Sequence, residues 1–219
     1  MANGNYSNIN GLNLYYEVHG TGKPLVLLHG GFGGTWMFEQ NLPAFSTNRQ
    51  VIAMELQGHG HTADIDRPLS FEHMADDVAA LIEHLGIGDS IVLGYSLGGG
   101  VALQTAIRHP NLVGKLVVVS APCKSDGWYP EVRAGMKLMN AEVGKTWVGS
   151  PMHQAYARVD PLQHFLIPRA GGRGHPVSGR GHATGGRPMR KASSALRPSR
   201  NNPGWFCRGK VVQQRRRCR

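Results

Sequence analysis

The most constraining feature of this sequence is a five-residue run, Gly94-Tyr95-Ser96-Leu97-Gly98, between two apolar segments. Residues 91–93 are a short apolar run that leads directly into it, and residues 97–109 follow with the spacing of a helix. In so tight a strand-to-helix turn, a side chain at Gly94 or Gly98 would collide with the neighbouring backbone. Ser96 is then held in a strained conformation with its hydroxyl exposed, which predicts a nucleophile. An ordinary glycine-rich turn with a bystander serine is the alternative, and the presence of both flanking elements disfavours it.

The segments around this run alternate between two periodicities. Continuous apolar runs, typical of strands that helices cover on both faces, occur at residues 25–28, 51–54, 91–93 and 116–119. Helical spacing occurs at residues 36–45, 70–85 and 97–109, and the second of these begins at Ser70 and stops at Gly86. Residues 12–18 are rich in β-formers and predict an early antiparallel hairpin strand. This alternation predicts an α/β fold with a mostly parallel sheet and flanking helices.

A second glycine-rich run, His29-Gly30-Gly31-Phe32-Gly33, follows the strand expected at residues 25–28. Backbone amides in such a loop can stabilise the oxyanion of a tetrahedral intermediate. We expect Gly31 or Phe32 to supply one donor, and Leu97, which follows the serine, to supply the other. His59 and His61 lie in a further glycine turn after the strand at 51–54, where a structural role is favoured over metal binding or catalysis.

Together these residues resemble the α/β-hydrolase superfamily. The resemblance covers about residues 8–122 and concerns the branch of carboxylesterases, lactonases, C–C bond hydrolases and cofactor-free haloperoxidase-like enzymes. It implies that Ser96 attacks an ester-like carbonyl, that a histidine is the general base, and that an acid orients this histidine. A serine at this position argues against the dehalogenase and epoxide-hydrolase branches, whose nucleophile is an aspartate.

The sequence departs from the family after Pro122. The family order places the acid and then the histidine on loops after two later strands, and no such strands are evident here. Five histidines follow Ser96, and none has the expected context for the triad base: His109, His153, His164, His175 and His182. Asp126 is a candidate for a displaced acid, although a solvated loop carboxylate is the favoured interpretation. We therefore expect impaired hydrolase activity, with the triad base unassigned.

Charge divides the chain sharply. Residues 1–160 contain ten Lys and Arg against fourteen Asp and Glu, whereas residues 161–219 contain fourteen Lys and Arg and no acid. We expect a hydrolase core at 1–122, a helical, lid-like segment at 123–160, and a disordered basic tail at 161–219. Because arginine, glycine, proline and alanine have GC-rich codons, the tail fits a GC-rich gene read out of frame, so that the fold is truncated. The alternative function is a noncatalytic scaffold whose tail binds nucleic acid.

Other features of the composition restrict the remaining classes. Cys123, Cys207 and Cys218 form no disulfide framework and no zinc-like spacing, so we expect no metal or cofactor and a reducing compartment. The N-terminal residues have no leader-like character, and no run of about 18 apolar residues occurs. The sequence therefore predicts a cytoplasmic protein that acts on small ester-like molecules and does not engage a membrane.

Overall fold

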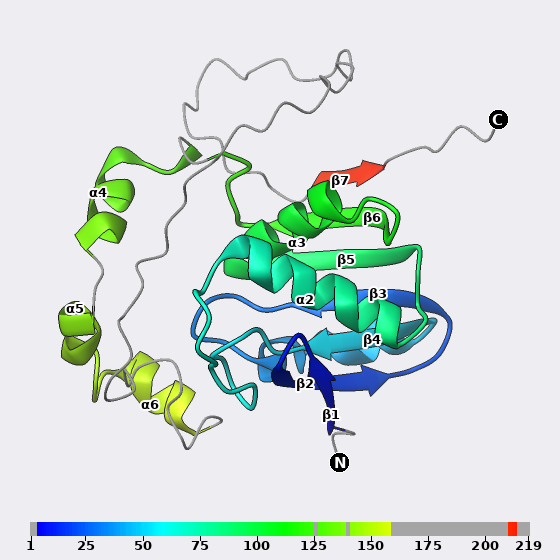
Figure 1. Cartoon of the computed structure of the whole chain (residues 1–219), viewed down its shortest axis with the longest axis horizontal. Helices are drawn as coiled ribbons and strands as arrows, with labels where there is room; N and C mark the ends of the chain where they lie inside the picture. The colour runs from blue at the N-terminus through cyan, green and yellow to red at the C-terminus, as the bar shows by residue number, and fades with distance from the viewer. Residues whose placement is uncertain (1–3, 125–126, 139–140, 159–209, 214–219) are drawn as a thin grey trace.

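The computed structural model describes residues 4–124, 127–138, 141–158 and 210–213. Within them lies one sheet with the strand order β1-β2-β4-β3-β5-β6-β7. Strands β4, β3, β5 and β6 run parallel, whereas the β1–β2, β2–β4 and β6–β7 pairs are antiparallel. The strands are β1 (Gly4–Ile9), β2 (Leu12–His19), β3 (Lys23–Leu28), β4 (Arg49–Met54), β5 (Ser90–Tyr95), β6 (Val113–Val119) and β7 (Lys210–Gln213). The expected mostly parallel α/β sheet is confirmed in its central strands (Figure 1).

An Asn-Gly turn joins the two N-terminal strands. Asn10 and Gly11 both have positive φ, at 50° and 84°, which is the geometry of a two-residue type I′ hairpin turn. The expected hairpin strand at residues 12–18 is present as β2, and its partner β1 was missed. Asn10-Gly11 was the sequence signal for that missing strand.

The apolar strand runs bury side chains on both faces of the sheet. Val26 and Leu28 of β3 pack into a core with α2 (Phe71–His84) and α3 (Leu97–Arg108), which lie side by side over one face (Figure 1). Leu25 and Leu27 of the same strand belong to a second core on the opposite face. One strand thus contributes alternate residues to two hydrophobic clusters, as expected for a sheet covered on both sides.

The helix boundaries follow local capping chemistry. Ser70 caps α2 by accepting a hydrogen bond from the His73 amide at 3.1 Å, and Gly86 ends the helical region with a φ of 63°. The helix expected at residues 36–45 is divided into a 3₁₀ turn, η1 (Thr35–Phe38), and α1 (Leu42–Ser46). Pro43 explains this difference, because proline fits the first turn of a helix and disrupts a helix interior.

Three short helices follow β6: α4 (Pro130–Leu138), α5 (Ala141–Thr146) and α6 (Pro151–Ala157). We call residues 130–138 and 141–157 the helical segment; it lies to one side of the sheet and its covering helices (Figure 1). Within the part of the chain that the structure describes, no helix is long and apolar enough to cross a membrane.

Residues 210–213 differ from the expectation of a tail without structure. They form β7, which pairs antiparallel with β6 between Lys115 and Val118. Without β7, the outer edge of β6 would leave its backbone N–H and C=O groups unpaired. The sequence Lys-Val-Val-Gln contains two β-branched residues, which favour strands. The other residues of the expected tail, 161–209 and 214–219, lie outside the described residues.

Candidate active site

The serine run lies at the junction of β5 and α3. Ser96 has a φ of 52° and a ψ of −113°, a conformation that costs free energy for a residue with a side chain. A Cβ on Gly94 would overlap the Gly98 carbonyl, and a Cβ on Gly98 would overlap the carbonyl oxygen of Leu28. Both glycines are therefore required by close backbone approach, as the sequence predicts. Ser96 is half-buried at this turn.

The glycine loop, residues 29–33, lies directly against the serine turn. A Cβ built on Gly30 would lie 3.5 Å from the Cβ of Ser96, and one built on Gly31 would lie 3.9 Å from Leu97 Cδ2. The Gly98 amide donates to the His29 carbonyl oxygen at 3.0 Å, which ties the first turn of α3 to this loop. The fold thus brings together the two runs that the sequence singles out, although they are more than 60 residues apart.

Within the glycine loop, Phe32 has a φ of 59°, which is unusual for a bulky residue. The Gly33 amide donates to the Gly30 carbonyl oxygen at 3.1 Å and closes a tight turn around Gly31 and Phe32. The amide of Leu97 is in the first turn of α3, where a helix leaves its N–H groups without intrahelical partners. Such amides can bind an anion.

A neutral, buried histidine links this loop to the segment after β4. His29 is fully buried; its Nδ1 donates to the Gly30 carbonyl oxygen at 2.7 Å, and its Nε2 accepts from the Leu56 amide at 3.1 Å. Burial, together with the neighbouring His59 ring, lowers the pKa of His29 to about 3, although the hydrogen bond to Gly30 opposes this shift. Both ring nitrogens are thus engaged in holding loops, so His29 has a structural role.

Two buried carboxylates lie beside η1, immediately after the glycine loop. The Thr35 hydroxyl lies 2.8 Å from Glu17 Oε1 and 3.3 Å from Glu55 Oε1, and the Thr35 amide donates to Glu55 at 3.1 Å. Burial alone would raise the pKa of the Glu17 carboxyl. The hydrogen bonds from Thr35, His19 and Tyr15 outweigh that effect and lower this pKa below its ordinary value. These contacts fix the start of η1 against β2 and β4.

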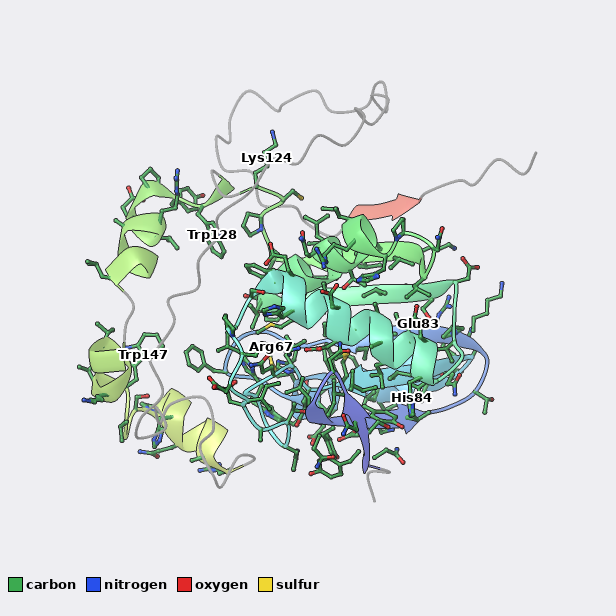
Figure 2. The ribbon with its side chains drawn as sticks, in the orientation of Figure 1. Arg67, Glu83, His84, Lys124, Trp128 and Trp147 are labelled. Carbon is green, nitrogen blue, oxygen red and sulfur yellow. The ribbon has the colours of Figure 1, made fainter. Side chains whose placement is uncertain are left out.

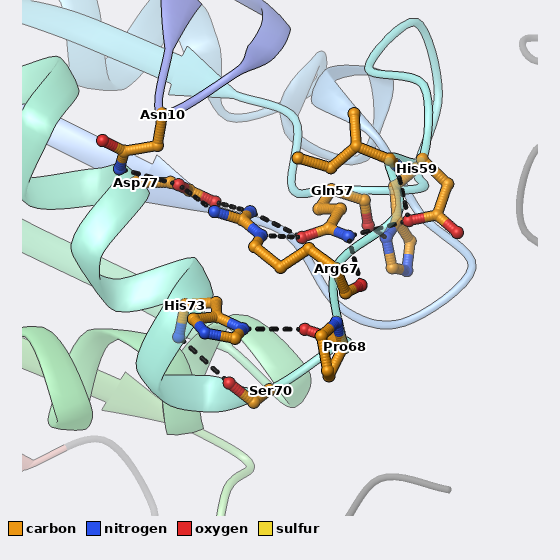
Figure 3. A network of polar contacts seen from close by, with 10 residues as sticks. Asn10, Gln57, His59, Arg67, Pro68, Ser70, His73 and Asp77 are labelled. Carbon is orange, nitrogen blue, oxygen red and sulfur yellow. Dashed lines mark hydrogen bonds and ion pairs between the residues drawn. The ribbon is translucent and has the colours of Figure 1, made fainter. Parts of the chain in front are cut away.

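A second polar network holds the segment between β4 and α2 (Figure 3). Arg67 Nη1 donates to Asp77 Oδ1 at 3.1 Å and its Nη2 to Oδ2 at 2.6 Å, while Asn10 Nδ2 donates to the same carboxylate at 3.0 Å. The Arg67 guanidinium also donates to Gln57 Oε1. The network joins the turn between β1 and β2, the segment after β4, and α2.

The described histidines after Ser96 are engaged elsewhere. His109 ends α3 and contacts Asp76 at 2.7 Å, at the opposite end of a twelve-residue helix from Ser96. Such a helix is about 18 Å long, so His109 is too far away to act as the base. The ring of His153 accepts from the Gly149 amide at 3.0 Å within its own turn.

The remaining candidates for the triad, Asp126, His164, His175 and His182, lie outside the described residues. In the part of the chain that the structure covers, no side chain hydrogen-bonds the Ser96 hydroxyl. Among the same residues, no group of three or more His, Cys, Asp and Glu side chains could hold a metal ion.

Sequence reasoning missed two features around the site. The contacts of Thr35 with Glu17 and Glu55 depend on the sheet order and have no local signal. The second is a ring contact between Phe32 and Trp147, which follows α5, with centroids 5.3 Å apart. Only the glycine pattern around residues 29–33 pointed to this region beforehand.

Comparison with known proteins is consistent with this geometry. The family model for the alpha/beta hydrolase fold matches residues 23–142. Over 158 residues the chain is 31% identical to the proposed carbamate hydrolase RutD of Azorhizobium caulinodans, covering 71% of this chain and 55% of that protein. It is 37% identical over 113 residues to the sn-1-specific diacylglycerol lipase ABHD11 of Danio rerio, covering 49% of this chain and 35% of that protein.

Two solved structures give the same result for the fold. The epoxide hydrolase CorEH has a TM-score of 0.62 at 26% identity, covering 76% of this chain and 70% of that chain. ALR0039 from Nostoc sp. PCC 7120 has a TM-score of 0.61 at 22% identity, covering 72% and 58%. The chain spans about half the length of these curated relatives of the RutD type. From the match over more than half of its residues, the chain belongs to the alpha/beta hydrolase fold family.

Proposed function

We propose that this protein is a serine hydrolase that acts on small carboxylic esters or related acyl compounds through Ser96. The observation that carries the proposal is the strained Ser96 beside the glycine loop, where a Cβ built on Gly30 would lie 3.5 Å from the Cβ of Ser96. Strain of this kind at a strand-to-helix turn is typical of a serine hydroxyl presented to a substrate. The amides of Leu97 and of Gly31 or Phe32 then supply the oxyanion donors.

The reaction follows from this arrangement. The Ser96 oxygen attacks the carbonyl carbon, the carbonyl oxygen becomes an oxyanion, and the backbone amides stabilise that charge. Collapse of the tetrahedral intermediate expels the alkoxide, which takes a proton from water, and leaves an acyl-serine that water then hydrolyses. Among the described residues no side chain hydrogen-bonds the Ser96 hydroxyl, so with these residues alone the Ser96 proton passes to water and the leaving group departs as an alkoxide. We therefore propose a slow hydrolase whose rate comes mainly from the oxyanion donors.

The relatives support the substrate class at a coarse level. One is named for carbamates and one for diacylglycerols, and both compounds present a carbonyl carbon to a nucleophile. For this chain we propose small acyl compounds with that shared group.

A p-nitrophenyl acetate assay tests the proposal. The wild type should release p-nitrophenolate faster than buffer alone, and Ser96→Ala should abolish the excess. Ser120→Ala is the matched control, because Ser120 also has a positive φ, 54°, at the end of the adjacent strand β6. Mass spectrometry of the peptide containing Ser96 should show an acetyl adduct. Equal rates for wild type and Ser96→Ala, with no adduct, would refute the role of Ser96.

A second candidate function rests on the charge distribution alone. Residues 161–219 contain fourteen Lys and Arg and no acid, a composition suited to phosphate backbones. On this hypothesis the chain binds single-stranded nucleic acid without sequence preference, and its affinity falls steeply with salt. Absence of binding at low ionic strength would remove this candidate.

A further inference from the structure

Phe32 combines an unfavourable backbone conformation with a distant aromatic partner. Its φ of 59° is one that bulky residues rarely adopt, so surrounding contacts must hold it there. Part of the constraint is local, since the Gly33 amide closes the turn onto Gly30. Met37 also packs against this turn, because a Cβ on Gly33 would overlap its sulfur.

The distant partner is Trp147, between α5 and α6. Its ring centroid lies 5.3 Å from that of Phe32, with an interplanar angle of 59°, which is within the range of favourable aromatic pairs. Hydrogen bonds from Val148 to the Lys145 carbonyl and from Ser150 to the Trp147 carbonyl hold this residue within a turn. Figure 2 shows Trp147 on the side of the helical segment that faces the sheet.

We propose that Trp147 is a positioning residue for the oxyanion site. By holding the Phe32 ring, Trp147 keeps the glycine loop in the strained conformation that presents the amide of Gly31 or Phe32 to the substrate of Ser96. The expected effect on kcat rests on the proposed function. The structural coupling of Trp147 to Phe32 rests on the ring contact between them.

Two roles of Trp147 make different kinetic predictions. A residue that only lines a substrate pocket contributes to binding, and its loss raises KM. A residue that holds an oxyanion donor acts on charge that develops in the transition state, and its loss lowers kcat at nearly constant KM. Loss of the free energy that such an aromatic pair contributes should lower kcat about three- to tenfold.

The experiment compares wild type, Trp147→Ala, Trp147→Phe and Phe32→Ala on p-nitrophenyl acetate. Trp147→Ala should lower kcat about three- to tenfold, and Trp147→Phe should recover most of the loss. The double variant with Phe32→Ala should be no slower than the worse single variant, since both remove one contact. Trp128→Ala is the control, because Trp128 lies near the other end of the same stretch of chain (Figure 2).

A second measurement needs no turnover. In amide NMR spectra, Trp147→Ala should change the chemical shift and the hydrogen-exchange rate of the Phe32 amide, and Trp128→Ala should change neither. An unaltered Phe32 amide in Trp147→Ala, or a pure rise in KM, would overturn the proposal. Equal hydrolysis by wild type and Ser96→Ala would refute the proposed function instead, and the Phe32 amide would still decide the coupling.

Discussion

The buried Arg67–Asp77 pair provides the sharpest test of how the segment after β4 is held (Figure 3). The Asp77 side chain is 2% exposed and that of Arg67 is 16% exposed. Replacing Asp77 by Leu leaves a guanidinium largely removed from water, with Gln57 as its remaining acceptor among the described side chains. Breaking a buried pair from one side typically costs about 3–5 kcal/mol. Because Gln57 still binds Arg67, we expect Asp77→Leu to lower the free energy of unfolding by about 3 kcal/mol.

The converse variant should cost more. Arg67→Met leaves the Asp77 carboxylate with Asn10 as its described side-chain donor, and we expect a loss of about 4 kcal/mol. In urea, each variant should unfold at a midpoint roughly 1–2 M below wild type, followed by tryptophan fluorescence. The double variant should be clearly more stable than the sum of the two losses implies, because no isolated charge remains buried.

The chain offers a matched control in the exposed pair of Asp76 and Arg108. These side chains are 33% and 40% exposed, and their charges contact at 2.8 Å. Solvent screens such a pair, so Arg108→Met should cost at most about 1 kcal/mol. If Asp77→Leu and Arg108→Met shifted the midpoint equally, or if the losses at Arg67 and Asp77 were additive, the reasoning about burial would be wrong.

Three further predictions concern the site and the tail. A Cβ on Gly98 would lie 2.5 Å from the His29 carbonyl oxygen, so Gly98→Ala should cost about 1–3 kcal/mol in urea unfolding, whereas Gly88→Ala, with open space around it, should have little effect. Because the pKa of His29 falls from 6.5 to about 3 on folding, the unfolded chain binds more protons between these values. The free energy of unfolding should therefore decrease as pH falls through that window, by up to about 1.4 kcal/mol per pH unit. His29→Gln should show a shallower dependence of this free energy on pH, and an identical dependence would contradict the assignment. Sequencing the gene should reveal, in another frame beyond residue 160, a strand ending in Gly-Asp-x-Asp and a later histidine; their absence from every frame would refute the out-of-frame hypothesis.

The features that the sequence predicts well are those with short-range causes. The glycines at 94 and 98 are dictated by backbone contacts within one turn, and Ser70 caps α2 through an amide three residues away. Strands β3 to β6 were recognisable because two covering layers require continuous apolar runs. The division of the helix at residues 36–45 also had a local cause in Pro43, although the apolar periodicity obscured it.

The features that escaped prediction depend on the topology of the sheet. Glu17 and Glu55 meet at Thr35 because β2 and β4 are neighbours, an order that no local pattern specifies. Likewise, Phe32 and Trp147 are separated by more than 100 residues. Neither aromatic residue carries a local signal for its partner. The charged and aromatic side chains that support the glycine loop were therefore available only from the structure.

Oxyanion stabilisation and proton transfer depend on different parts of an alpha/beta hydrolase fold. Both proposed oxyanion donors depend on local turns and on buried contacts of β2, β4 and the glycine loop, all within the described residues. Proton transfer depends on a base and an acid that, in this family, come from later strands. Stabilisation of an oxyanion helps every ester, whereas expulsion of an ordinary alkoxide also needs a proton from a general acid. The described site should therefore favour esters whose leaving group is stable as an anion, and its rate should fall steeply as the leaving group becomes more basic.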